Sequence, residues 1–334
     1  MKYITLFETT AAYNTATLDL PNVSLIEETN GVAYHPYIPE TKVVAKYNVT
    51  DTSNPTALRT NYENNIFKTM EIDGVMLDEL VTDYTFDTTG VHTVKYELYD
   101  ETKLGNQAPV FDNSNLIECI IPDSVISIGN NTFYECSGLT NCTIGSGVTN
   151  ICAYAFYNCT SLTTIDIPDS VTSIDMSAFR NCSGLTSCTI GSGVTSIGKS
   201  AFYECSSLTS INIPSGVTSI ADAAFAYCTG LTSINIPSGV TSIADSAFAS
   251  CSTLASIEIP DSVISIGNSA FFCCVNLTSI ISNATTAPSI QSNTFQDVKT
   301  DGVLTVSSGS TGYDAWMRTG DYYLGKYNWT KVEQ

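Results

Sequence analysis

Apolar residues recur in the middle of the chain with a fixed spacing of 23 residues. Each unit holds a phenylalanine, a cysteine follows it three positions later, and leucine, valine and isoleucine keep the same spacing. A constant period of this length indicates a solenoid, in which every unit forms one coil and stacks on the next. The columns expected to fill its core are Phe133, Phe156, Phe179, Phe202, Phe225, Phe248 and Phe271, with Cys136, Cys159, Cys182, Cys205, Cys228, Cys251 and Cys274.

One unit, residues 208–230, shows how a coil is expected to fold. Its LTSINI segment alternates apolar and polar residues, which is the period of a half-buried strand. Pro214 and Gly216 then turn the chain, and a second short extended stretch follows. Phe225 and Cys228 have the spacing of one helical turn that faces the core. Because a lone coil cannot bury these side chains, we expect the coils to be stable only when stacked.

The repeated motif resembles that of a known family. L-x-x-I-x-I followed by Pro, then V-x-x-I and A-F-x-x-C, is similar to the BspA-type leucine-rich repeat of bacterial surface proteins, over residues 116–295. The resemblance implies a right-handed leucine-rich-repeat solenoid, mainly β with short helical turns, and a role in binding or adhesion. Residues 145–147 and 191–193 depart from the motif, since they read GSG where other coils read PDS or PSG. Phe295 follows after 24 residues, so we expect a distorted last coil.

The residues before the repeats have a different pattern of apolar and polar positions. Residues 36–105 contain segments that alternate or are rich in β-branched and aromatic residues, and Asp73-Gly74 and Thr89-Gly90 are typical of turns. This pattern predicts a small immunoglobulin-like β-sandwich. The solenoid is then expected over residues 106–295.

The two ends of the chain are expected to attach and to close the molecule. The opening YITLFETTAAYN resembles the starts of structural proteins from phages of gut Bacteroidetes, which would make residues 1–35 an attachment segment; the alternative is an ordinary extra strand or docking arm. Residues 296–334 resemble the caps of such arrays, and a cap is required because an open solenoid end exposes core and strand edges. We expect the last coil to be covered by Trp316, Tyr323 and Trp329.

Charge narrows the choice of partner. The chain carries 33 acidic and 13 basic residues, a formal net charge of −20. Nucleic acid is not an expected partner, because a phosphate-binding surface needs clustered Lys or Arg. No stretch approaches the roughly 18 apolar residues of a membrane-spanning helix, so membrane insertion is not expected either. The start shows no secretory signal, which favours a route other than general secretion or a signal that has been removed.

The twelve cysteines suggest redox or metal chemistry, but their spacing argues against it. No C-x-x-C pair occurs, and the two histidines, His35 and His92, lie outside the repeats. We therefore expect no metal site and no cofactor, and buried reduced thiols in the core; disulfides along the column are the alternative. Calcium at the acidic turns is a weaker alternative, since solvated turns explain the same residues.

Catalysis is not expected. The sequence has no G-x-S-x-G elbow, and the repeats contain no histidine that could activate a nucleophile. Asp166 and Glu258 share an outward strand column, but four coils separate them by roughly 19 Å, which is too far for a glycosidase pair. A scaffolded polysaccharide-acting enzyme is therefore retained only as a second alternative.

Two surfaces are candidates for binding. The outward strand positions are small and polar, and they include Asp166, Asn212, Asn235 and Glu258. The column after each phenylalanine places tyrosine and arginine in successive coils, and these residue types are enriched at interface hot spots. Packing between coils explains this second column equally well. Its members are Tyr134, Tyr157, Arg180 and Tyr203.

Together these patterns predict a non-enzymatic recognition or adhesion protein. The opening segment favours display on a phage virion, as a fibre, tail or capsid decoration protein. The partner would be a protein or glycan on a bacterial surface, or another virion protein. The alternative is a secreted bacterial cell-surface adhesin of the BspA type. Both a monomer and a homo-oligomer fit the sequence.

Overall fold

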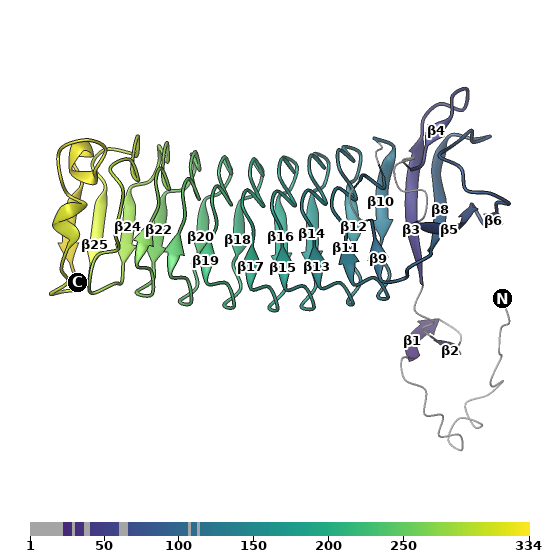
Figure 1. The fold of residues 1–334 in the computed structure, drawn as a ribbon, viewed down its shortest axis with the longest axis horizontal. Helices are drawn as coiled ribbons and strands as arrows, with labels where there is room; N and C mark the ends of the chain where they lie inside the picture. The colour runs from purple at the N-terminus through teal and green to yellow at the C-terminus, as the bar shows by residue number, and fades with distance from the viewer. Residues whose placement is uncertain (1–22, 29–30, 37–40, 60–65, 106–107, 112–113) are drawn as a thin grey trace, which may run out of the picture. The chain divides into compact units, whose positions relative to one another are not determined.

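The computed structural model describes residues 23–28, 31–36, 41–59, 66–105, 108–111 and 114–334 (Figure 1). The chain divides into two compact units, residues 1–39 and 40–334. In the first unit, β1 (Val23–Glu28) and β2 (Gly31–Pro36) form an antiparallel pair. The rest of the expected attachment segment at 1–35 lies outside the described residues.

The second unit begins with an antiparallel sheet. β3 (Lys42–Val49) pairs with β8 (Gly90–Leu98), β8 with β5 (Phe67–Ile72), and β5 with the short β6 (Val75–Met76). β4 (Thr56–Ala57) and β7 (Asp83–Tyr84) form a separate two-stranded ladder. Alternate residues of β8 are buried, because successive side chains of a strand point to opposite faces.

The expected immunoglobulin-like sandwich is not confirmed, because the N-terminal sheet continues into the solenoid. β3 also pairs antiparallel with β10 (Leu116–Ile120), and β10 pairs in parallel with β12 (Asn141–Thr143). A solenoid end exposes unpaired backbone N–H and C=O groups, and β3 satisfies them on the first coil. Alternation along the sequence predicted these strands, but it carries no information on which strands pair.

Parallel strands then follow at one per coil, as Figure 1 shows along the middle of the second unit. Their outward residues are exposed and their inward residues are buried. Hydrogen bonds join β14 to β16, β18 to β20, and β22 to β24. The strands are β14 (Thr164–Ile167), β16 (Ser187–Ile190), β18 (Ser210–Asn212), β20 (Ser233–Asn235), β22 (Ser256–Ile259) and β24 (Ser279–Ser282).

A second column of two-residue strands runs beside the first. Each places a buried isoleucine or leucine against the core and a serine, asparagine or lysine outward. The strands are β9 (Lys103–Leu104), β11 (Ser127–Ile128), β13 (Asn150–Ile151), β15 (Ser173–Ile174), β17 (Ser196–Ile197), β19 (Ser219–Ile220), β21 (Ser242–Ile243) and β23 (Ser265–Ile266). The predicted mainly β solenoid of 23-residue coils is thus confirmed.

The phenylalanine column forms a continuous stack of fully buried rings. Neighbouring centroids lie between 4.9 and 5.8 Å apart from Phe111 to Phe295. Trp316 packs on Phe295 at 5.3 Å and ends the stack. The core therefore extends beyond the repeat columns at both ends. Phe111 lies only 22 residues before Phe133, so its membership of the stack is not visible from the exact period.

Tight turns between coils have two backbone requirements. Gly145 lies so close to the preceding turn that a Cβ atom would lie 2.5 Å from the carbonyl carbon and oxygen of Pro122, which explains the GSG departure. From Phe133 to Phe271, the second residue after each phenylalanine of the column adopts a left-handed conformation, and so does the second residue before it. Ala223 adopts this conformation, with φ at 50°, although a residue with a Cβ atom does not favour it.

The C-terminal residues extend the sheet before closing it. β25 (Val303–Val306) pairs in parallel with β24, and β26 (Thr330–Glu333) pairs in parallel with β25. Two 3₁₀ helices, η2 (Tyr313–Ala315) and η3 (Leu324–Tyr327), lie between these strands in sequence. Of the three aromatic residues expected to cover the last coil, Trp316 and Trp329 are buried and Tyr323 is half-buried.

Candidate binding surfaces

The outward face of the strand column is polar over six successive coils. Its residues are exposed and short, so they form a broad surface of hydroxyl, amide and carboxylate groups. We call this surface the sheet face. Its members from β12 to β22 are Asn141, Thr143, Thr164, Asp166, Ser187, Thr189, Ser210, Asn212, Ser233, Asn235, Ser256 and Glu258.

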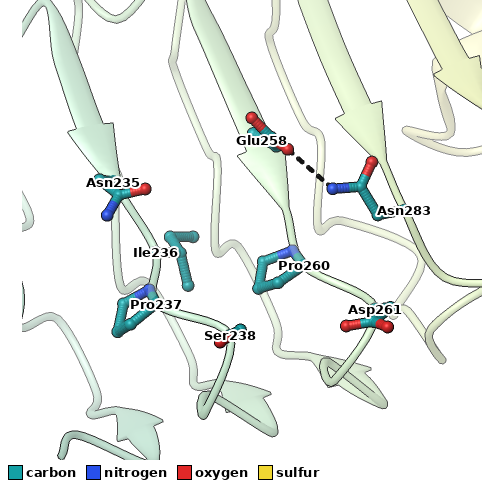
Figure 2. Close-up of a pocket in the computed structure, with 8 residues that line it drawn as sticks. All are labelled: Asn235, Ile236, Pro237, Ser238, Glu258, Pro260, Asp261 and Asn283. Carbon is teal, nitrogen blue, oxygen red and sulfur yellow. Dashed lines mark hydrogen bonds between the residues drawn. The ribbon is translucent and has the colours of Figure 1, made fainter. Parts of the chain in front are cut away.

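A hollow of about 540 Å³ lies at the C-terminal end of the sheet face, and Figure 2 shows its lining. Glu258 accepts a hydrogen bond of 2.7 Å from the side-chain amide of Asn283. Asn235 lies on the neighbouring coil, and Asp261 and Ser238 come from the turns that follow the strands. The full lining is Asn235, Ile236, Pro237, Ser238, Glu258, Pro260, Asp261 and Asn283.

Three sheet-face residues that the sequence singled out, Asn212, Asn235 and Glu258, lie on successive coils in the structure. Asn212 is the direct parallel partner of Asn235, and Glu258 lies one coil further. Asp166 lies on β14, separated from Glu258 by β16, β18 and β20. Sequence reasoning missed Asn283, which lies in the turn of the distorted last coil; the loss of the PDS or PSG motif there was the available signal.

Beyond the hollow the sheet face becomes partly apolar. Ile281, Val303 and Val332 are each about 40% exposed, at 38%, 39% and 40%. Ile281 and Val332 flank Thr305 in the parallel register, and Val303 is the partner of Ser279. The C-terminal end of the face therefore offers apolar contact beside hydrogen-bonding groups.

The column after each phenylalanine forms a half-exposed row on the turn side of the coils, which we call the Tyr–Arg stripe. Its members are Tyr134, Tyr157, Arg180 and Tyr203. Tyr134 and Tyr157 stack with centroids 4.8 Å apart and rings 9° from parallel. The guanidinium carbon of Arg180 lies 4.3 Å from the centroid of Tyr203. Tyr203 also packs against Tyr227 at 5.2 Å, although Tyr227 comes from the next column along the coil. Packing between coils thus covers part of these rings, and the four residues of the stripe stay half-exposed.

Charge around the stripe acts on its tyrosines. Burial raises the pKa of the Tyr203 hydroxyl, the Glu204 carboxylate and then Tyr227 raise it further, and Arg180 lowers it. Burial and then Glu135 likewise raise the pKa of Tyr134. Both hydroxyls therefore remain protonated hydrogen-bond donors at neutral pH.

The cysteine column is occupied by free thiols, as are all twelve cysteines of the chain. Each thiol of this column donates a hydrogen bond to the backbone carbonyl of the phenylalanine one coil earlier; for Cys228 and Phe202 the distance is 3.1 Å. Burial raises the pKa of the Cys228 thiol to about 12. A neutral buried thiol is a poor nucleophile and a poor metal ligand. The cysteines of this column therefore fill the core and donate hydrogen bonds to backbone carbonyl groups.

The remaining candidates for chemistry are engaged in structural contacts. His92 uses both ring nitrogens, one to Asp73 at 2.6 Å and one to the carbonyl of Thr88 at 2.9 Å. At the turns considered for calcium, Asp123 and Asp169 each accept the backbone N–H of the serine one coil later. Within the part of the chain that the structure describes, no cluster of three or more His, Cys, Asp or Glu side chains could hold a metal ion. Among the same residues, no helix has the length and apolar character needed to cross a membrane.

Stacked coils with a main column of parallel strands, inward columns of Leu and Phe, and an extended outward face define a leucine-rich-repeat solenoid. The sequence profile of the BspA type leucine rich repeat region matches six copies, over residues 102–232 and 218–313. The chain therefore belongs to the BspA-type leucine-rich repeat family. No curated protein matches it.

Solved structures of bacterial leucine-rich repeat proteins are similar to this chain. A protein from Bacteroides ovatus is 20% identical, with a TM-score of 0.52, and the match covers 95% of this chain and 77% of that one; this similarity shows the fold. A T. pallidum leucine rich repeat protein is 29% identical over 48% of this chain and 78% of that one, with a TM-score of 0.45. A leucine rich cell surface protein from Faecalibacterium prausnitzii is 26% identical over 71% and 84%, with a TM-score of 0.38.

Proposed function

We propose that this chain is a non-enzymatic recognition protein that binds a macromolecular partner through the sheet face of its solenoid. The observation that carries this proposal is the sheet face itself, because its short polar side chains project from six adjacent coils. Solenoids of this kind create extended surfaces for partners larger than a small-molecule ligand. We place the centre of binding at the hollow, where Asn235, Glu258 and Asn283 surround a depression of about 540 Å³.

The chemistry of the hollow limits the partner. Carboxylate and amide groups can accept and donate hydrogen bonds to sugar hydroxyls or to the polar groups of a protein surface. A net charge of −20 also favours partners with basic rather than acidic surfaces. A protein with a basic surface patch on a bacterial surface meets both conditions, and a neutral glycan meets the first.

We propose the bacterial cell surface as the setting. The family membership supports this setting, and the F. prausnitzii protein is itself named a cell surface protein. Display on a phage virion is the second setting. It is based on the resemblance of the opening segment, most of which lies outside the described residues. Immunogold labelling with serum against the purified chain separates the two settings, since label on cells supports the first and label confined to virions supports the second.

Binding is tested with the full chain on fluorescent beads, incubated with intact Bacteroides cells and with a glycan array. We expect saturable binding that soluble chain displaces. A variant with Asn212→Ala, Asn235→Ala and Glu258→Gln should bind at least fivefold less. Absence of saturable binding to both probes would contradict the proposal.

A matched variant controls for the loss of one charge and of two polar side chains. Ser219→Ala, Ser242→Ala and Asp222→Asn remove one carboxylate and two polar side chains outside the sheet face, and binding should stay within twofold of wild type. The enzyme alternative is tested in the same samples. Turnover of a polysaccharide that Asp166→Asn or Glu258→Gln abolishes would replace recognition with catalysis.

A further inference from the structure

The Tyr–Arg stripe contains a cation that the fold does not neutralise. Arg180 is half-buried and lies over the ring of Tyr203, at 4.3 Å from its guanidinium carbon. Among the described residues no carboxylate lies within ion-pair distance of it. Its Nε atom is buried and has no hydrogen-bond partner among them. A half-exposed guanidinium without an ion-pair partner can still donate hydrogen bonds from its terminal nitrogens to an external acceptor.

The other base of the repeats shows the contrast. Residues 111–282 contain only two basic residues, Arg180 and Lys199. Lys199 is mostly exposed and pairs with Asp222 of the next coil at 3.6 Å. Because this segment contains twelve acidic residues, a shortage of acids does not explain why Arg180 lacks an ion pair while Lys199 has one. Removing a cation from water without a partner costs free energy, which binding of an anion would recover.

Neutral hydrogen-bonding groups surround Arg180 at the centre of the stripe. Asn158 and Asn181 follow Tyr157 and Arg180 in the next column, and their side-chain amides are hydrogen-bonded to each other. The two carboxylates of that column, Glu135 and Glu204, lie beside Tyr134 and Tyr203 instead. The local charge is thus positive at the centre and negative toward the ends, which suits a single carboxylate flanked by neutral or basic groups.

The ring geometry favours a protein partner over a glycan. Tyr134 and Tyr157 cover each other's faces, and Tyr203 lies between Arg180 and Tyr227. Sugar rings stack on an open aromatic face, and a neighbouring side chain covers at least one face of each of these tyrosines. Tyrosine and arginine in a compact group are typical of protein interface hot spots.

We propose that Arg180, with the flanking tyrosines, binds an aspartate or glutamate side chain of a protein partner. The guanidinium fork contacts both carboxylate oxygens, and the tyrosine hydroxyls contact the neighbouring backbone. This site is separate from the sheet face, so it provides a second point of attachment for the recognition protein. Two such contacts on one partner raise the overall affinity above that of either alone.

A displayed library of random dodecapeptides serves as the probe. The library is first depleted on immobilised full-length Arg180→Gln and then selected on the full-length wild-type chain. We expect enriched peptides to share an Asp or Glu. Replacing that residue by Asn or Gln should weaken binding to wild type on the order of tenfold to a hundredfold, but should leave binding to Arg180→Gln within twofold. Such coupling assigns the carboxylate to Arg180.

Control variants separate the site from charge, folding and the sheet face. Lys199→Gln removes the same charge one coil away and should bind the peptides as wild type does. Arg180→Lys keeps the charge without the fork and should restore only part of the affinity. The Asn212/Asn235/Glu258 variant should bind them unchanged, so failure here is distinct from failure of the sheet-face function. Melting temperatures check that each variant is folded.

Three results would overturn the proposal. The first is that no peptide is enriched on wild type over Arg180→Gln. The second is that enriched peptides lack an acidic residue or bind independently of it. The third is that a glycan array detects acidic glycans whose binding is lost in Arg180→Gln, which would assign the stripe to a different class of partner.

Discussion

Cys228→Ala tests the consequence of burying one thiol in every coil. The wild-type thiol is completely buried and donates a hydrogen bond to the carbonyl of Phe202 at 3.1 Å. Burial raises its pKa from an ordinary value of 9.0 to about 12. The unfolded chain therefore loses this proton near pH 9, while the folded chain keeps it until about pH 12. As the pH rises through this window, the unfolded state is favoured and the free energy of unfolding falls.

The size of the effect follows from the shift. Three pKa units correspond to about 4 kcal/mol, lost at about 1.4 kcal/mol per pH unit once the unfolded thiol is ionised. At neutral pH the alanine variant should be less stable by about 1–2 kcal/mol, because it lacks the hydrogen bond and leaves a small void. By pH 10 the loss of the wild-type contribution, about 1.4 kcal/mol, should nearly cancel this difference.

The assay is equilibrium denaturant unfolding, followed by circular dichroism between pH 7 and pH 10 with a reductant present. The quantity compared is the difference in unfolding free energy between wild type and Cys228→Ala at each pH. Val217→Ala is the control, since Val217 is fully buried in the same coil but has no proton to lose. Its difference from wild type should be independent of pH.

A difference for Cys228→Ala that stays constant from pH 7 to pH 10 would refute the reasoning. It would mean that the thiol has the same pKa in the folded and unfolded chains, which a buried column does not allow. Burial also raises the pKa of six further thiols of buried cysteines, so wild type should lose stability steeply above pH 9. These thiols are Cys119, Cys159, Cys188, Cys205, Cys251 and Cys274.

Three further predictions concern packing and backbone, each measured by thermal and denaturant unfolding. Phe202→Ala should cost about 3–5 kcal/mol, because it interrupts the ring stack with a void; an unchanged melting temperature would argue against the stack. Gly145→Ala should destabilise through backbone contact at 2.5 Å, whereas Gly239→Ala, where the nearest atom is 3.2 Å away, should be tolerated. Ala223→Gly should stabilise by roughly 1 kcal/mol at its positive φ, while Ala224→Gly, buried and outside that conformation, should destabilise; equal effects would contradict the conformational argument.

The coil itself was predictable because its signals are local. Alternation in LTSINI predicts which residues of β18 point inward, and the spacing of Phe225 and Cys228 predicts a turn that faces the core. The prediction for one coil then applies to every coil, because coils of the same sequence pattern stack the same residue types on each other. The sheet face could be predicted for the same reason, because its members are the outward half of the same alternation.

The hollow and the exceptional state of Arg180 could not be predicted in the same way. The hollow depends on Asn283, in a turn that has lost the repeat motif, lying within hydrogen-bond distance of Glu258. The state of Arg180 depends on which side chains of the coils on either side reach it; among the residues that the structure describes, Tyr203 does and no carboxylate forms an ion pair with it. Glu258 and Asn283 are 25 positions apart in the sequence, and Arg180 and Tyr203 are 23 positions apart. The distance between the members of each pair depends on how tightly neighbouring coils pack.

The sequence by itself determined the family, the 23-residue coil and the division of each coil into buried and exposed positions, because a period is independent of the surroundings. Only the tertiary structure decided where the array ends. β3 pairs with β10, Phe111 joins the ring stack out of register, and Trp316 closes the stack at the other end. The physical reason is that the terminal coils expose backbone groups and core, and segments of unrelated sequence can cover them once the chain brings them within reach.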